Sequence, residues 1–154
     1  MSTVLVLRTC NADGTSHKGF QWPLEVGKQV TAPDWDPVPK CGHGLHGLLW
    51  GEGDGSLLNW KSDARWLVLS VDSESIVDLK DKVKFPSCTV VHIGDQLSAT
   101  QYILQHGGEG KAITGASVIV GNNSHAIAGY RGYATAGYEG HATAGYEGHA
   151  TAVE

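Results

Sequence analysis

The chain has 154 residues, and its 16 acidic and 11 basic side chains give a net charge of −5 at pH 7. Between positions 107 and 154 there are two basic and four acidic residues, so no basic stripe for phosphate contacts is present and nucleic acid binding is not expected. The sequence shows no charged and apolar leader and no apolar run of about 18 residues, so neither secretion nor a membrane span is predicted.

The three cysteines are widely spaced and odd in number: Cys10, Cys41 and Cys88. This pattern is typical of reduced thiols in a cytoplasmic protein rather than of a disulfide framework. If the chain is encoded by a phage, the expected compartment is the cytoplasm of the host cell.

Residues 1–106 predict a small α+β head domain. All five tryptophans lie before position 67, and roughly 100 residues can bury a core of their own. The expected strands have runs of apolar and β-branched residues, and a turn with the Asp13-Gly14 signal follows the first of them. These strands cover 3–9, 20–30 with a break at Trp22-Pro23, 66–71 and 88–93.

The candidate chemistry lies in the glycine-rich loop 40–47, which carries Cys41, His43 and His46. A zinc site would need a second, distant pair of ligands, and three ligands on so short a loop would be strained, so we expect no metal and no cofactor. A catalytic interpretation would make Cys41 a nucleophile and one histidine its base, but side chains so close in sequence seldom meet in the right geometry. The favoured interpretation is a tight structural loop.

A helix is expected between Gly94 and Gly107. Asp95 is a typical N-cap, and Leu97, Tyr102 and Leu104 form an apolar face.

From Gly121 the sequence repeats every eight residues as GNNSHAIA, GYRGYATA, GYEGHATA and GYEGHATA. Each unit combines a glycine-bounded corner with a four-residue strand in which alternate alanines point inward. Eight residues cannot enclose a core, so two units form one 16-residue coil of a narrow β-solenoid. A similar pattern upstream predicts that this tail covers 107–154 in about three coils, with the alanines at 126, 134, 142 and 150 inside.

The coil period also predicts stacked side chains on the outer surface. His125 is expected to stack on His141, Tyr130 on Tyr146, and Tyr133 on His149. We take the outward Tyr130, Tyr138 and Tyr146 together with His125, His141 and His149 as candidate binding residues.

Two resemblances follow from these motifs. The AGY and TA segments spaced by eight resemble the octapeptides of bacterial ice-nucleation proteins, which implies a solenoid with outward threonine rows and tyrosine ladders. This sequence has isolated threonines at 135, 143 and 151 in place of T-x-T pairs.

The segments 18–21 (KGFQ), 25–28 (EVGK), 41–46 and 65–71 resemble an uncharacterised domain family of phage and other bacterial genomes, often with a GY-x-G-x-A tail. This second resemblance implies a phage or prophage setting and no established activity.

The sequence favours a non-catalytic binding or assembly protein whose solenoid contacts a protein partner or itself, including an inhibitor of a host defence system or host enzyme. A second hypothesis is a protein that sequesters a nucleotide-like molecule between head and tail, with Trp22 or Trp35 stacking on it. A third is a small enzyme that uses Cys41, His43 and His46 with Arg65 or Glu52.

The sequence also predicts a homodimer through the tail. The unit 145–152 repeats the one before it, with no visible cap after it, and an open strand edge favours pairing. Two arrangements are expected: tail end to tail end, or side by side along Tyr130, Tyr138 and Tyr146, with the heads outside.

Overall fold

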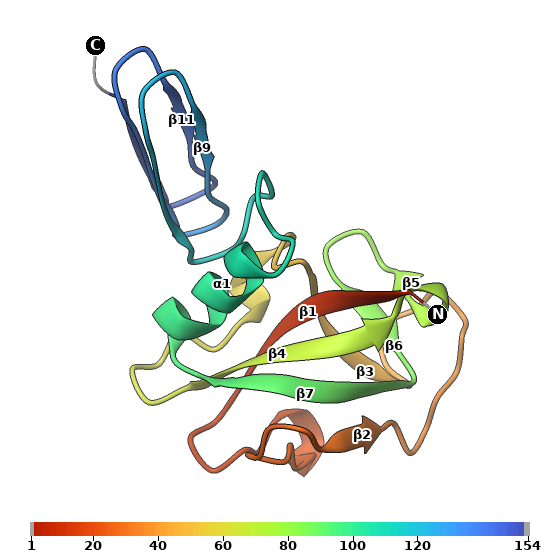
Figure 1. The fold of residues 1–154 in the computed structure, drawn as a ribbon. Helices are drawn as coiled ribbons and strands as arrows, with labels where there is room; N and C mark the ends of the chain where they lie inside the picture. The colour runs from red at the N-terminus through yellow and green to blue at the C-terminus, as the bar shows by residue number, and fades with distance from the viewer. Residues whose placement is uncertain (1, 153–154) are drawn as a thin grey trace.

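The computed structural model describes residues 2–152 and shows a mainly β protein with one α-helix (Figure 1). A seven-stranded sheet forms the head, and every paired neighbour in it runs antiparallel. Its strands in spatial order are β2 (Gln29–Thr31), β7 (Ser87–Gly94), β4 (Arg65–Asp72), β1 (Thr3–Cys10), β3 (Leu45–Leu49), β6 (Val83–Phe85) and β5 (Val77–Asp78).

The predicted strands at 3–9, 66–71 and 88–93 are confirmed as β1, β4 and β7. The predicted broken strand at 20–30 is wrong for most of its length, because only Gln29–Thr31 joins the sheet. Trp22 is 1% exposed and packs into the core from a loop, and Pro23 after it has no amide proton to donate to a strand.

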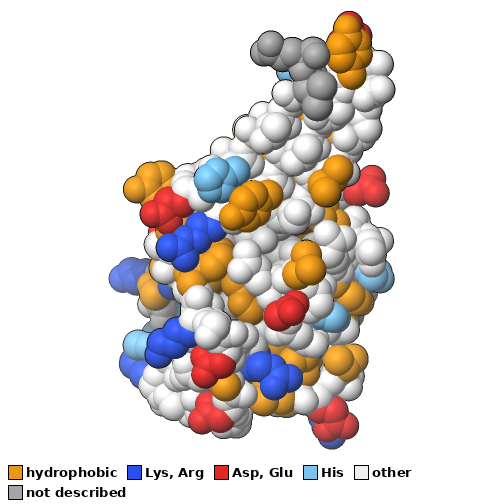
Figure 2. Space-filling view, turned by 90° about the vertical axis from the view of Figure 1, so that its left-hand side faces the viewer, with side chains coloured by type: hydrophobic (Ala, Val, Ile, Leu, Met, Phe, Trp, Pro, Cys, Tyr) orange, Lys and Arg blue, Asp and Glu red, His pale blue; other side chains and the backbone are white. Residues whose placement is uncertain are grey.

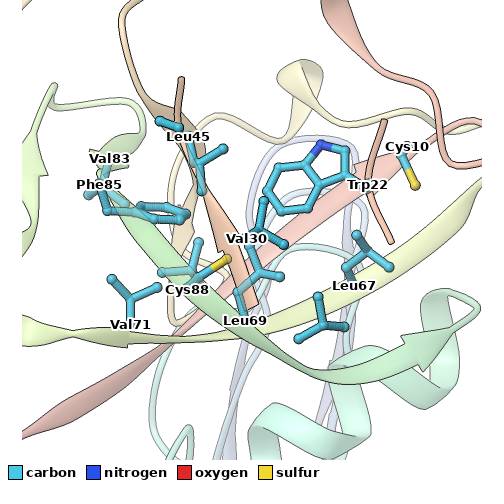
Figure 3. Close-up of a cluster of buried hydrophobic side chains, with 13 residues drawn as sticks. Cys10, Trp22, Val30, Leu45, Leu67, Leu69, Val71, Val83, Phe85 and Cys88 are labelled. Carbon is cyan, nitrogen blue, oxygen red and sulfur yellow. The ribbon is translucent and has the colours of Figure 1, made fainter. Parts of the chain in front are cut away.

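The central strands have apolar side chains on both faces because both faces of the sheet are covered. On one face, a buried cluster contains Val6, Trp22, Leu69, Phe85 and their neighbours, several of them labelled in Figure 3. On the other face, Leu7 and Val68 pack with Ala99 and Ile103 of helix α1 (Gln96–Gln105). Successive residues of a strand therefore supply two separate cores.

Asp95 caps α1 as predicted, and its side chain accepts the Ser98 amide while Ser98 Oγ accepts the Asp95 amide. The predicted apolar face is partly wrong. Leu97 is 58% exposed, whereas Ala99, Thr100 and Ile103 are buried. The reason is the i, i+4 spacing of Ala99 and Ile103, which directs this stripe towards the sheet.

Three short 3-10 helices complete the head, namely η1 (His17–Gly19), η2 (Gly55–Leu57) and η3 (Ser73–Ser75). None of the helices within residues 2–152 has the length and apolar character needed to cross a membrane.

Residues 117–152, which we call the repeat stack, project from the head in Figure 1. One parallel sheet has the order β12-β10-β8, and a second contains β11 and β9. Their bounds are β8 (Ser117–Val120), β9 (His125–Ile127), β10 (Tyr133–Ala136), β11 (His141–Thr143) and β12 (His149–Ala152). Ala134 pairs with Val118 and with Ala150, each sixteen positions away.

The interior of the repeat stack is thin and made largely of alanine. Ala126, Ala128, Ala134 and Ala136 are each at most 1% exposed. Ala142 is half-buried and Ala150 is exposed. The predicted inward position is therefore confirmed for Ala126 and Ala134. Ala150 pairs in register with Ala134 and lies on the same side of its sheet, but it is exposed because no further strand among the described residues covers it.

The first strand of the repeat stack begins at Ser117, whereas the tail was predicted to start near Gly107. Residues 112–116 nevertheless support the stack: the amides of Gly129 and Tyr133 donate to the carbonyls of Ile113 and Ala116. Ile113 and Ala116 are fully buried in the core beside α1. This segment therefore belongs to the head in its packing and to the stack in its hydrogen bonds.

We expect Ala134→Leu to destabilise the protein by about 1–3 kcal/mol, because the extra carbons cannot fit between the two sheets without moving the backbone. Thr135→Ala, a change at the next residue on the outward side, is the matched control and should alter stability by less than about 0.5 kcal/mol. Urea unfolding of both variants measures this difference. Equal destabilisation by both would show that the inward and outward faces are assigned incorrectly.

Candidate functional site

A cleft of about 740 Å³ opens on the head beside β1 and β3. Its walls come from segment 16–22, from loop 41–47 and from Leu57, Leu58 and Lys82. Phe20 supplies aromatic surface, and its ring meets that of the buried Trp22 edge to face at 5.5 Å. The cleft therefore combines an apolar wall with several basic groups.

Arg8 lines this cleft from the central strand β1. It lies on the same side of the strand as Val6 and Cys10, which belong to the apolar cluster around Trp22. Nη1 donates to the carbonyl oxygen of His46 at 2.8 Å, and the guanidinium lies 4.7 Å from the centre of the Trp22 ring. Nε is buried and has no hydrogen-bond partner among the described residues. Burial lowers the pKa of Arg8 to about 10, so the group keeps its charge at neutral pH.

Two lysines of the head approach the same loop. Lys82 Nζ donates to Cys41 Sγ at 3.0 Å, and Lys84 Nζ donates to the Gly42 carbonyl at 3.3 Å. Lys84 is only 1% exposed and lies 5.6 Å from the centre of the Trp35 ring. Glycine at position 44 is needed here, because a Cβ would lie 2.9 Å from that ring. The tight loop predicted from the sequence is thus a loop packed around a buried lysine.

The protonation of His46 is disfavoured by its burial and by these cations. Burial lowers its pKa to about 4, helped by the charges of Lys82, Arg8 and Lys84 and opposed by Asp34. Its Nε2 accepts the Gly42 amide at 3.3 Å, so the ring is neutral and serves as an acceptor.

Cys41, His43 and His46 all line the cleft, but the structure does not join them into a catalytic or metal-binding group. Cys41 is paired with Lys82, and His43 is exposed and lies 3.7 Å from Asp34. In the part of the chain that the structure describes, no three His, Cys, Asp or Glu side chains converge to hold a metal. The expectation that the protein has no metal stays a prediction.

Glu52 and Arg65, which the enzyme hypothesis paired with this loop, lie outside the cleft lining. Glu52 accepts the Ala112 amide at 3.2 Å, where the head meets the segment below the repeat stack. Arg65 starts β4 and is absent from the cleft lining. Burial raises the pKa of Cys88 to about 12, so this thiol is not a nucleophile.

Trp22 and Trp35 do not lie between head and tail, contrary to the hypothesis of a ligand held there. Both belong to the cluster on the sheet face opposite α1, whereas Ile113 and Ala116 below the repeat stack pack on the α1 side.

The repeat stack carries the second set of candidate residues, and the rings lie in the pairs that the spacing predicts. The ring centres are 4.9 Å apart for His125 and His141, 5.1 Å for Tyr133 and His149, and 5.9 Å for Tyr130 and Tyr146. The planes in each pair differ by 16–25°. Each pair connects strands or corners sixteen residues apart.

The single tyrosine face predicted from the sequence is wrong. Tyr130 and Tyr146 share one corner of the coil, whereas the backbone of Tyr138 pairs with Asn122 and Asn123 at the opposite corner. A coil of two octapeptides places neighbouring units on opposite sides, so only every second tyrosine can align. Tyr130 is also half-buried against the head, where its ring lies 5.7 Å from Trp60.

Arg131 completes this junction. It forms a salt bridge with Glu147 at 2.9 Å and lies 5.0 Å from the centre of the Trp60 ring. Glycine is also required at position 55, since a Cβ there would overlap the ring of Tyr130.

Sequence reasoning missed Arg8, Lys82, Lys84 and Arg131. Two signals were available: a charged residue inside the apolar run TVLVLRT, and an arginine at 131 where the two following units have glutamate. No local pattern marked the two lysines, because they reach loop 41–47 only through the pairing of β3 with β6.

The family model called domain of unknown function DUF7666 matches residues 4–105. The chain belongs to this family. This assignment covers the sheet, the cleft and α1, and it assigns no activity to the DUF7666 domain.

The curated relatives are bacterial ice nucleation proteins. The chain is 41% identical over 105 residues to the ice nucleation protein InaU of Pantoea ananas, which covers 67% of this chain and 10% of the relative. It is 42% identical over 102 residues to a Pseudomonas fluorescens ice nucleation protein, covering 65% of this chain and 8% of the relative. The chain thus spans about a tenth or less of these relatives. No solved structure shows a significant match.

We expect His46→Gln to reduce the loss of stability on acidification. The folded pKa of about 4 lies below the ordinary value of 6.5, so the unfolded chain binds the additional proton between these two values. Stability from the neutral ring is complete above about pH 6.5 and is lost as the pH falls towards 4, by about 1–3 kcal/mol. Urea unfolding between pH 7 and pH 4 measures the effect. His43→Gln, at an exposed ring, is the control. If the two variants retain the same pH dependence as the wild type, the neutral state of His46 does not stabilise the fold.

Proposed function

We propose that this chain is a non-catalytic binding and assembly protein whose repeat stack is a β-solenoid that contacts a second copy of the chain. The similarity to ice nucleation proteins suggests a non-enzymatic repeat protein. The outward face of the sheet β12-β10-β8 is the observation that carries the proposal.

This face presents two rows of side chains. One row contains Ser117, Tyr133 and His149, and the other contains Ile119, Thr135 and Thr151. Ile119 is 78% exposed and Tyr133 is 54% exposed, although both are large and partly or wholly apolar. Tyrosine and aliphatic side chains on a regular flat surface are typical of the central part of an interface.

The same face contains no carboxylate, lysine or arginine among its six side chains. Figure 2 shows the charged side chains gathered mainly over the head, with few on the visible side of the projecting stack. In a two-fold symmetric dimer the same face of both copies forms the contact, so a charged side chain on this face would lie near its own copy. A face without charges avoids this repulsion. A second copy of the chain therefore suits this face.

Three parts of the sequence-based interpretation stay predictions: a different protein as partner, the phage origin, and the inhibition of a host defence system or host enzyme. The three cysteines are free thiols, and we place the protein in the cytoplasm, where thiols stay reduced.

Ice is a second candidate ligand, favoured by the identity of about 40% to ice nucleation proteins. On the face described above, Thr135 and Thr151 lie side by side, and Ile119 precedes them in the row. A droplet-freezing assay distinguishes the two functions, since ice nucleation requires an increased freezing temperature and self-association does not.

Light scattering should show a dimer of the intact chain at micromolar concentrations. Tyr133→Lys or Ile119→Lys should convert it to a monomer, because a two-fold contact brings the new charges together. Tyr138→Lys at the opposite corner of the coil is the matched control and should remain dimeric. A monomeric wild type, or a dimer that survives both substitutions on the face, would exclude this interface.

A further inference from the structure

The charge of Arg8 is not balanced by any side chain of the structure. Its guanidinium forms one hydrogen bond, to the His46 carbonyl, and leaves Nε buried without a partner among the described residues. No carboxylate within residues 2–152 forms a salt bridge with it. Removing a cation from water without a counter-ion costs several kcal/mol of folding free energy. A bound anion would offset that cost.

The cleft in front of Arg8 concentrates positive charge in a chain whose net charge is −5. Arg8, Lys18 and Lys82 line it, whereas Asp34 is the one carboxylate of the lining and lies beside His43. The low pKa of His46 reflects the same excess, since Lys82, Arg8 and Lys84 all disfavour its protonation. The electrostatic potential in the cleft is therefore positive although the chain as a whole is negative, and the cleft attracts anions.

The size and the walls of the cleft narrow the class of anion. A volume of about 740 Å³ lies in the range of sites for small organic molecules and exceeds the needs of a bare phosphate or acetate. Phe20, Leu57 and Leu58 provide apolar surface next to the basic groups. An arginine beside a lysine suits phosphate and carboxylate groups, which accept charge-assisted hydrogen bonds from both.

We propose that the head cleft binds a small organic anion, with its phosphate or carboxylate group held by Arg8 and Lys82 and its apolar part against Phe20, Leu57 and Leu58. The site is separate from the repeat face, and its occupation does not depend on self-association. Two cations favour a phosphate monoester, which carries nearly two negative charges at neutral pH, over a carboxylate with one.

Titration calorimetry of the full chain with phenyl phosphate, benzoate, inorganic phosphate and benzyl alcohol tests the proposal. Phenyl phosphate and benzoate should bind, because each combines an aromatic ring with an anion, and benzyl alcohol should not. Tighter binding of phenyl phosphate than of benzoate identifies a phosphate ester as the natural class, and the reverse order identifies a carboxylate. Inorganic phosphate should bind more weakly than phenyl phosphate, because it makes no apolar contact. Failure of both aromatic anions to bind at millimolar concentration would overturn the proposal.

Variants distinguish this role of Arg8 from a purely structural one. Arg8→Met should abolish binding yet leave the free protein as stable as the wild type or more stable, because an unpaired buried charge is replaced by an apolar chain of similar length. Lys82→Gln should weaken binding by about tenfold, and Lys61→Gln, outside the cleft lining, should leave it unchanged. Unaltered affinity in Lys82→Gln together with Arg8→Met would contradict the assignment.

The imidazole of His46 supplies a measurement that does not depend on the folding of any variant. In the wild type, saturation with the bound anion should raise the pKa of His46, as followed by NMR, because a negative charge neutralises the nearby cations. An unchanged titration curve in the presence of a saturating anion would place the anion outside the cleft and overturn the proposal.

Discussion

The pairing of β1 with β4 is the interaction on which the rest of the molecule depends. All eight residues of β1 have partners in β4, from Thr3 opposite Asp72 to Cys10 opposite Arg65. Because successive side chains point to opposite faces, this ladder fixes two cores at once. One core holds Trp22 and the wall of the cleft, and the other holds α1, Ile113 and the base of the repeat stack. A shift of one residue would exchange them.

The repeat stack could not supply its own stability in the same way. Its interior is mainly alanine, which buries little apolar area in each coil, so parallel backbone ladders and the junction with the head carry much of the order. At that junction, Trp60 contacts Tyr130 and Arg131, and Gln96 Nε2 donates to the Gly115 carbonyl at 3.0 Å. The head therefore provides the first layer on which later coils are built.

Two surfaces with opposite chemistry result from this arrangement. The face of β12-β10-β8 is flat and uncharged and suits contact with another macromolecule. The cleft beside β1 is concave and basic and suits a small anion. Each contains a departure from the simplest sequence rules: Ile119 is a large apolar side chain at an exposed position, and Arg8 is a buried cation without a salt bridge among the described residues. Such departures are typical of functional positions.

The sequence by itself determined the local periodicities. Runs of apolar and β-branched residues predicted β1, β4 and β7, the Asp95 cap predicted the start of α1, and the repeat of eight predicted which rings stack sixteen residues apart. These features succeed because they depend on backbone geometry that repeats along the chain.

Only the tertiary structure determined which side chains from distant segments are in contact and which are exposed. The repeat predicted an outward ring for Tyr130, but this side chain is half-buried because Trp60, seventy positions earlier in the chain, packs beside it. The sequence placed the candidate catalytic and metal-binding residues in loop 41–47. The side chains that donate hydrogen bonds to this loop are Arg8 from β1 and Lys82 and Lys84 from the β6 region. Charge and burial at such places depend on contacts between distant segments, and no local pattern of residues encodes them.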